Sequence, residues 1–125
     1  MTNNQIIQHQ KQIVAATSPL IRASVRKLQL VARAVKKMAP REAIAALTMM
    51  PKAAAEPIRK TIVQAVANAA NNFKINEKNL NAMNIEVQEG VTMKRFRIGG
   101  RGRVKPVLKR TSRVTVKLFT ENGKQ

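Results

Sequence analysis

The sequence predicts an α+β protein in which helices precede most of the strands and a long basic β-hairpin extends outward from them, and three observations support this. Apolar residues recur every three or four positions between residues 24 and 73, as in amphipathic helices. After residue 79 apolar and polar residues alternate, as in strands. Residues 93–110, MKRFRIGGRGRVKPVLKR, contain eight basic side chains and no acidic one.

The chain begins with a polar segment, residues 1–11, which predicts a tail without fixed structure. This segment lacks the basic region and apolar core of a secretory signal, and it is poor in the Arg and Ser of a transit peptide. The segment QIVAA, residues 12–16, then predicts a first strand. We expect residues 12–125 to form one domain, since a chain of this length buries roughly two-thirds of its unfolded surface.

The first helix is predicted from an apolar stripe that runs from Leu28 to Val35. Its start is ambiguous, because Ser18 precedes Pro19, which is favoured in a first turn, while Ser24 offers a later cap. Four basic residues would share another face of this helix if it extended far enough back, and with this net charge we interpret that face as turned toward phosphates. They are Arg22, Arg26, Arg33 and Lys37.

Two further helices are predicted before the last strands. APREAIAAL gives a short helix that starts at Pro40 and turns Ile44 and Leu47 inward. A longer helix is expected from about residue 52 to residue 73. Pro57 is tolerated there only in or near the first turn, since deeper in the helix it would cost ~3 kcal/mol. One side of this helix carries Ile58, Ile62, Val66, Ala69 and Phe73.

Two strands flank the basic stretch. MNIEVQEGV alternates through Ile85 and Val87, and SRVTVKLF alternates in the same way. Glycines at positions 99, 100 and 102 supply the backbone freedom of a turn. We therefore predict a hairpin over about residues 88–108, with arms of ~10 residues that reach ~30 Å from the body. It has few apolar residues to bury, and a bare two-stranded ribbon is marginal in water, so we expect a partner to hold it.

The net charge points to a polyanionic partner. There are 24 Lys and Arg against 6 Asp and Glu, which gives a charge of +18 and a pI near 11.8. Self-repulsion of this size opposes compaction unless a polyanion neutralises it. Nucleic acid is the first candidate, an anionic membrane surface the second and an acidic protein the third. The membrane is disfavoured, because no apolar run approaches ~20 residues and the basic stretch lacks a broad apolar helical face.

Residues that carry catalysis or bind metals are scarce. The one histidine, His9, lies in the polar tail, and the chain has no cysteine and no aspartate. The lack of cysteine fits a reducing compartment. GGRGRV is not a P-loop, because no Lys-Ser or Lys-Thr follows its glycines. We therefore expect no enzymatic activity, no metal and no cofactor.

Aromatic residues make up only 2% of the chain, and this narrows the kind of nucleic acid. Modules that recognise single-stranded bases stack them on aromatic side chains, which this chain can do little of. We expect instead that it recognises the shape and backbone of a folded RNA through Arg and Lys. The alternative is an architectural DNA-binding protein, whose β-arms typically carry an apolar wedge at the tip. Here Pro106 lies on the return arm and only Ile98 is near the tip.

MKRFRIGGRGRVKPVLKRTSRVTV resembles the C-terminal signature of the bacterial large ribosomal subunit protein 22 family, a basic hairpin followed by Lys-Arg-Thr-Ser and a strand. SVRKLQLVA, residues 24–32, resembles the start of that family's first helix, which favours Ser24 as the cap. ANAANN, residues 67–72, resembles the end of its third helix. The chain departs from the family where Val25, Ala70 and Arg113 replace Pro, Glu and His, and where IGG at the hairpin turn replaces Pro-Arg-Ala.

The resemblance implies three helices packed on a small three-stranded antiparallel sheet, with the basic hairpin as an extended arm. It also implies a structural component of the large ribosomal subunit that binds large-subunit ribosomal RNA and supports assembly. Its hairpin would line the nascent-peptide exit tunnel, so neighbouring ribosomal proteins and the nascent peptide become expected partners. The expected location is a ribosome of the cytoplasm or of an organelle, without contact to a membrane and without a homo-oligomer.

The resemblance and the charge pattern together give two sets of expected site residues. The residues expected to bind ribosomal RNA are Arg22, Arg26, Lys27, Arg33, Lys37, Lys94, Arg95, Arg97, Arg101, Arg103, Lys105, Lys109, Arg110, Thr111, Ser112 and Arg113. The residues expected at the tunnel-lining tip are Arg97, Ile98, Gly99, Gly100, Arg101, Gly102 and Arg103.

Overall fold

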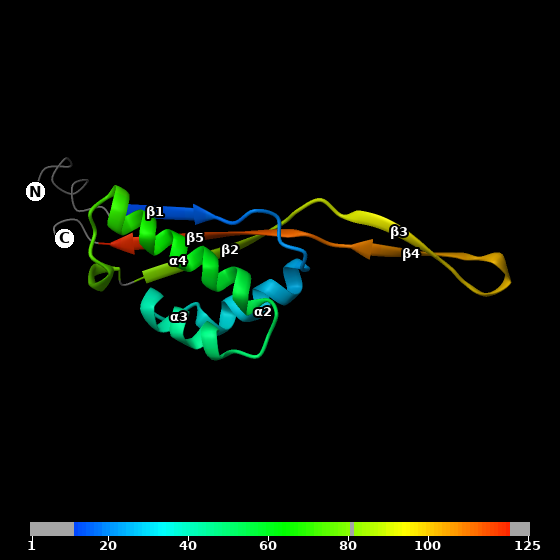
Figure 1. The fold of residues 1–125 in the computed structure, drawn as a ribbon, viewed down its shortest axis with the longest axis horizontal. Helices are drawn as coiled ribbons and strands as arrows, with labels where there is room; N and C mark the ends of the chain where they lie inside the picture. Colours follow the sequence, from blue (N-terminus) through cyan, green and yellow to red (C-terminus); the bar gives the residue numbers. More distant parts are fainter. Residues whose placement is uncertain (1–11, 81, 121–125) are drawn as a thin grey trace, which may run out of the picture.

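The computed structural model describes residues 12–80 and 82–120, so the predicted tail at residues 1–11 lies outside the described residues (Figure 1). Its helices and strands, with two short 3-10 turns at Glu77–Asn79 and Gly100–Gly102, follow in chain order. They are β1 (Gln12–Thr17), α2 (Val25–Val35), α3 (Pro40–Met49), α4 (Ala55–Asn72), β2 (Ala82–Glu89), β3 (Met93–Ile98), β4 (Val104–Lys109) and β5 (Ser112–Thr120).

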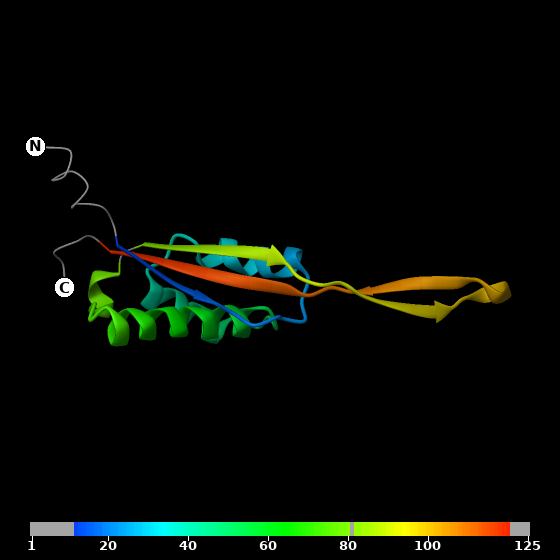
Figure 2. The ribbon, with the colours of Figure 1, turned by 90° about the horizontal axis from the view of Figure 1, so that it is seen from above.

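Strand β5 is the centre of a three-stranded antiparallel sheet of order β1-β5-β2. Its residues Val114, Val116 and Leu118 are fully buried, while the residues between them are at least partly exposed. One face of the sheet is therefore covered: α4 packs on β1 and β5, α2 on β2, and α3 on α4 (Figure 2). The predicted α+β fold, with three helices and a three-stranded antiparallel sheet, is confirmed.

Helix α2 begins where Ser24 caps it. The Ser24 hydroxyl accepts a hydrogen bond from the Lys27 backbone N–H at 3.4 Å, and the apolar stripe from Leu28 to Val35 is buried. The later of the two caps offered by the sequence is therefore the one used, and the helix does not extend back to Arg22. Arg22 precedes the cap, because the segment before it forms a β-bridge between Ile21 and Ser112 that holds the backbone extended.

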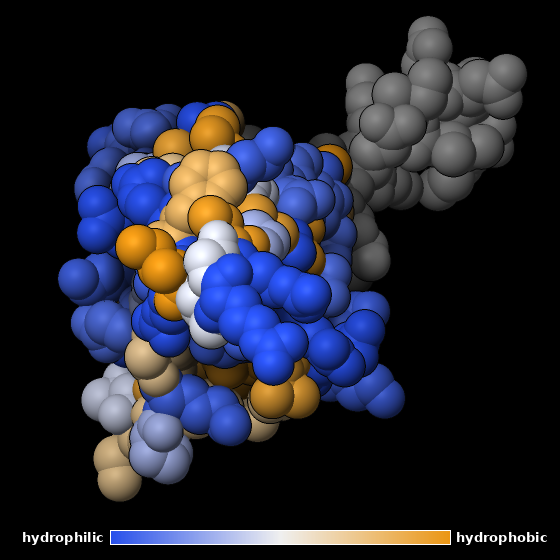
Figure 3. Space-filling view, turned by 90° about the vertical axis from the view of Figure 1, so that its right-hand side faces the viewer, coloured by the Kyte–Doolittle hydropathy of each residue, from blue (hydrophilic) through white to orange (hydrophobic). Residues whose placement is uncertain are grey.

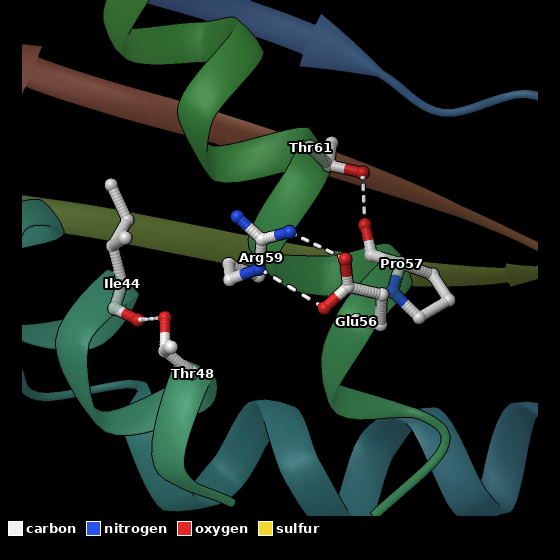
Figure 4. A network of polar contacts seen from close by, with 6 residues as sticks. All are labelled: Ile44, Thr48, Glu56, Pro57, Arg59 and Thr61. Carbon is white, nitrogen blue, oxygen red and sulfur yellow. Dashed lines mark hydrogen bonds and ion pairs between the residues drawn. The ribbon is translucent and has the colours of Figure 1, made fainter.

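Helix α4 begins late enough for Pro57 to lie in its first turn, as predicted (Figure 4). Phe73, which the sequence places on the same side as Ile58 and Ile62, follows the last helical residue and is 44% exposed. Lys74 adopts a left-handed conformation with φ of 55°, which reverses the chain just after the helix. Ile75 then packs into the core in place of Phe73, and its N–H donates to the Ala69 carbonyl at 3.0 Å.

Strands β3 and β4 form a separate two-stranded antiparallel ribbon, paired from Met93 opposite Lys109 to Ile98 opposite Val104. The ribbon projects from one end of the helix-covered sheet, along the long axis of the molecule (Figure 1). Its tip is a turn in which the Gly99 N–H donates to the Arg103 carbonyl at 2.6 Å. In that turn Arg101 and Gly102 both have positive φ.

The ribbon joins the sheet at a crowded point. Pairing of β2 with β5 ends at Glu89 opposite Ser112, and the Gly90 N–H then donates to the Thr111 carbonyl at 2.9 Å. A Cβ at Gly90 would lie 2.7 Å from the Thr111 hydroxyl and 2.8 Å from a methyl carbon of Leu20. A larger residue at position 90 would therefore require the Thr111 or Leu20 side chain to move.

Candidate nucleic-acid interface

The start of α2 is fastened to the start of β5, beside the base of the ribbon. Ile21 and Ser112 exchange two backbone hydrogen bonds of 2.8 and 2.9 Å, and the Ser112 hydroxyl donates to the Ala23 carbonyl at 2.7 Å. Segments almost ninety residues apart are thereby brought together. Basic side chains from the start of α2 and from the base of the ribbon meet at this junction.

The meeting point is a cavity of about 600 Å³ between the N-terminus of α2 and the base of the ribbon, which we call the basic cleft. Five cations from three segments of the chain (residues 22–27, Arg95 and residues 109–110) line it, and no carboxylate does. An open, acid-free cluster of this kind attracts phosphate groups, and the N-terminal end of a helix adds to the attraction. The lining residues are Arg22, Ala23, Ser24, Lys27, Met93, Arg95, Leu108, Lys109 and Arg110.

Arg110 also borders a second cavity of about 530 Å³, whose lining includes the carboxylate of Glu89. The Arg110 guanidinium lies 3.6 Å from the Glu89 carboxylate, and both side chains are at least half exposed. An ion pair this exposed contributes little to stability. Glu89 therefore partly neutralises Arg110 at the edge of the cleft. The lining of the cleft contains no carboxylate that could neutralise the other four cations.

The exposed side of α2 extends the cationic surface away from the cleft. Arg26, Lys27 and Arg33 are exposed there and line a cavity of about 460 Å³ around Leu30. Lys37 is exposed just past the helix end. Lys36 was missed by the sequence analysis, because it does not fit the spacing that singled out its neighbours. It lines a further cavity with Arg33 and residues of β2.

The ribbon carries the remaining predicted cations, all exposed. The side chain of Arg95 lines the basic cleft and also donates to the Lys94 carbonyl at 3.0 Å. The predicted tip residues occupy the end of β3, the turn and Arg103, where Gly99 alone is half-buried. The exposed ribbon cations are Lys94, Arg95, Arg97, Arg101, Arg103, Lys105 and Lys109.

Three of the residues predicted to bind RNA follow the ribbon and lie apart from its exposed cations. Thr111 and Ser112 are buried, and their hydroxyls donate to the carbonyls of Val91 and Ala23 inside the protein. Arg113 is exposed and alternates with buried Val114, so it points to the open face of the sheet. The hydrogen bonds of Thr111 and Ser112 therefore support a role in holding the ribbon and the start of α2 in place.

Within residues 12–80 and 82–120, no group of three or more His, Cys, Asp or Glu side chains is placed to hold a metal ion. None of the helices in this part of the chain is long and apolar enough to cross a membrane. The features that stand out are the basic cleft, the α2 surface and the ribbon.

Fold and surface together define a class of small basic α+β protein that bears a projecting β-ribbon. Residues 16–119 match the family model described as Ribosomal protein L22p/L17e, and the chain belongs to that family. A curated relative, the large ribosomal subunit protein uL22 of Pediococcus pentosaceus, is 39% identical over 101 residues. The matched region covers 81% of this chain and 86% of the relative. The resemblance seen in the sequence is confirmed.

Proposed function

We propose that the protein is a structural, non-catalytic component of the large ribosomal subunit and that it binds large-subunit ribosomal RNA. Its family and the name of its relative support the location in the ribosome, whether of the cytoplasm or of an organelle. The observation that carries the RNA-binding part is the basic cleft, in which five cations from distant segments converge without a carboxylate. No membrane contact, cofactor or homo-oligomer belongs to this proposal.

In the cleft, the cations bind phosphates of folded RNA. Arg22, Arg95 and Arg110 offer planar guanidinium groups that hold a phosphate through two hydrogen bonds, while Lys27 and Lys109 act as point charges. The exposed cations of α2 continue the contact along the RNA backbone. Thr111 and Ser112 act indirectly, because their internal hydrogen bonds hold the cleft in shape.

Beyond its base, which lines the cleft, the ribbon carries the RNA contact outward. Each of its strands has six residues, which corresponds to ~20 Å of reach. The α2 surface and the ribbon can thus hold segments of RNA that lie apart, which is how the protein supports subunit assembly. A free ribbon of two strands is marginally stable, so RNA contact also orders it.

The tip of the ribbon, residues 97–103, lines the nascent-peptide exit tunnel in this proposal. Its exposure, its glycines and its lack of acids suit a surface that lies between RNA and a passing peptide. The nascent peptide and neighbouring large-subunit proteins are then its further partners. Because IGG stands where the family usually has Pro-Arg-Ala, the contacts at the tip are this chain's own.

The proposal is tested by sedimenting a native lysate through a high-salt sucrose gradient while the full-length protein is tracked. We expect the protein in the large-subunit peak, since salt strips loosely adhering cations. A variant with Arg22, Lys27 and Lys109 changed to Gln should no longer sediment with the large subunit. The matched control changes the exposed Lys52, Lys60 and Lys78, which lie outside the basic cleft, and should stay. Release of the unaltered protein, or migration with DNA, contradicts the proposal.

A further inference from the structure

The two faces of the ribbon differ in chemistry. Side chains of residues directly opposite each other in an antiparallel pair lie on the same face. On one face Lys94 pairs with Leu108, Phe96 with Pro106 and Ile98 with Val104. On the other face Met93 pairs with Lys109, Arg95 with Val107 and Arg97 with Lys105. We call the first the apolar face and the second the cationic face.

The apolar face has no cover. Phe96 is 74% exposed, Ile98 85%, Val104 59% and Leu108 45%, and Pro106 between them is exposed as well. Figure 3 looks along the ribbon toward the body and shows hydrophobic surface beside strongly hydrophilic surface at this end of the molecule. A contiguous set of exposed apolar side chains marks a binding surface rather than scattered chance exposure.

The charges around the apolar face limit what can cover it. The ribbon is a single layer of two strands, so only the thickness of that layer separates the apolar face from the cations opposite. Lys94 lies on the apolar face itself, and residues 93–110 contain no acid. A partner that encloses this ribbon must therefore carry negative charge together with apolar groups. RNA carries both on every nucleotide, as a phosphate and a base.

The apolar face is also continuous with the proposed phosphate site. Leu108, at its inner end, lines the basic cleft beside Lys109, which belongs to the cationic face. An RNA strand that leaves the cleft thus meets cations on one side of the ribbon and apolar side chains on the other. The same molecule can supply both contacts over the length of the ribbon.

We propose that the apolar face binds unpaired nucleobases of the RNA whose phosphates contact the cationic face, with Phe96 as the stacking platform. Aromatic side chains stack on any base, because every base presents a flat π-face. Ile98, Val104 and Pro106 provide the apolar surroundings that keep water from the stacked base. The inference rests on the proposed function and adds to it the chemical group that this face recognises.

The test compares two polyanions, large-subunit ribosomal RNA and inorganic polyphosphate, which has phosphates but no bases. Phe96→Ala in the full chain should weaken RNA binding about tenfold, within the ~5- to 150-fold expected when one stacking interaction is removed. The slope of log K against log salt should stay unchanged, because every phosphate is still bound. Binding to polyphosphate should also stay unchanged. Since Phe96 is exposed, the variant is expected to fold, which circular dichroism verifies.

The matched control lies on the opposite face. Arg97→Gln should weaken binding to both polyanions and reduce the salt slope by about 0.7 to 0.9 for its one phosphate. Phe96→Trp should bind RNA at least as tightly as the original chain. Phe96→Leu should bind RNA almost as weakly as Phe96→Ala, because leucine has no ring on which a base can stack. Dimethyl sulfate should modify particular bases more strongly in the Phe96→Ala complex.

Other results overturn the inference. Equal RNA affinity for Phe96→Ala and the unaltered chain means that no base stacks there, while the proposed function stands. Unchanged RNA affinity combined with altered elongation in complete ribosomes assigns the apolar face to the nascent peptide instead. If the unaltered protein fails to bind the RNA at all, the proposed function fails together with the inference.

Discussion

The hydroxyl of Ser112 donates a hydrogen bond of 2.7 Å to the carbonyl oxygen of Ala23, a residue 89 positions earlier in the chain. Ser112 is fully buried and begins the central strand, while Ala23 immediately precedes the cap of α2. This contact fixes where α2 starts relative to the base of the ribbon. Together with the backbone bridge between Ile21 and Ser112, it holds the two sides of the basic cleft next to each other.

Replacing Ser112 with Ala should therefore destabilise the protein. The Ala23 carbonyl loses its donor, and a typical intramolecular hydrogen bond contributes about 0.5–1.5 kcal/mol to the free energy of unfolding. Urea denaturation measures the loss. Thr48→Ala is the control, since that exposed hydroxyl donates to Ile44 in its own helix and its removal should change stability by no more than ~0.5 kcal/mol (Figure 4). Equal stability of the two variants would show that the buried hydrogen bond is not needed.

The elements themselves could be predicted from the sequence, because each depends on neighbouring residues. The stripe from Leu28 to Val35 and the alternation through Val114 are local patterns, and both residue sets are buried as expected. The apolar side of α4 ends before Phe73, because the left-handed residue Lys74 turns the chain and Ile75 enters the core instead. No periodic pattern signals such a residue.

The site was harder to predict, because its parts come together only in three dimensions. Charge and the family resemblance marked Lys27 and Lys109 as candidates, but nothing in their spacing shows that they line one cavity. That depends on the bridge between Ile21 and Ser112, which also keeps Arg22 out of the helix. The two faces of the ribbon likewise follow from its register, which a Gly-rich turn of unknown length does not specify.

Neutralising Lys109 and Arg110 should weaken binding to large-subunit ribosomal RNA and flatten its salt dependence. Changing both to Gln should reduce the slope of log K against log salt by nearly one for each phosphate that the variant no longer binds, on the scale of duplex nucleic acid. Filter binding at several salt concentrations measures this slope. An unchanged slope would mean that these two side chains are merely solvated.

Glu89→Gln should act in the opposite direction. It removes the carboxylate that lies 3.6 Å from Arg110 and thereby frees this guanidinium for a phosphate. We expect tighter RNA binding, measured at low salt where surface charges are least screened. Lys117 and Glu86 form a comparable ion pair on the sheet, so Glu86→Gln serves as the control and should leave RNA binding nearly unchanged.

Glu56 should titrate below the ordinary range of a glutamate. The Arg59 guanidinium donates hydrogen bonds to its carboxylate, at 3.1 Å from Nε, and this lowers the pKa of Glu56 and raises the pKa of Arg59 (Figure 4). A lowered pKa in the folded state stabilises the protein above the unfolded pKa, and this contribution is lost as the pH falls through the folded pKa. An NMR titration of the Glu56 carboxyl carbon measures the pKa. In Arg59→Gln it should move up, and identical midpoints would contradict the pairing.

The outer end of the ribbon should be removable without harm to the body. Arg97 and Lys105 are register partners, so replacing residues 98–104 with Asn-Gly joins them through a two-residue hairpin turn. None of the replaced residues belongs to the buried core, so we expect the free energy of unfolding to change by no more than ~0.5 kcal/mol. Thermal unfolding of the free protein measures this change.

The shortened protein should also remain in the large-subunit peak of a high-salt gradient, because the basic cleft and the α2 surface are intact. If the tip lines the exit tunnel, as we propose, a stalled nascent peptide should cross-link to the ribbon of the original chain and not to that of the shortened chain. Substituting Gly100 alone is the control, since a Cβ there meets no atom within 4 Å and the tip keeps its length. If the shortened chain fails to fold, the ribbon contributes to the core, and the division into a stable body and a dispensable outer ribbon is wrong.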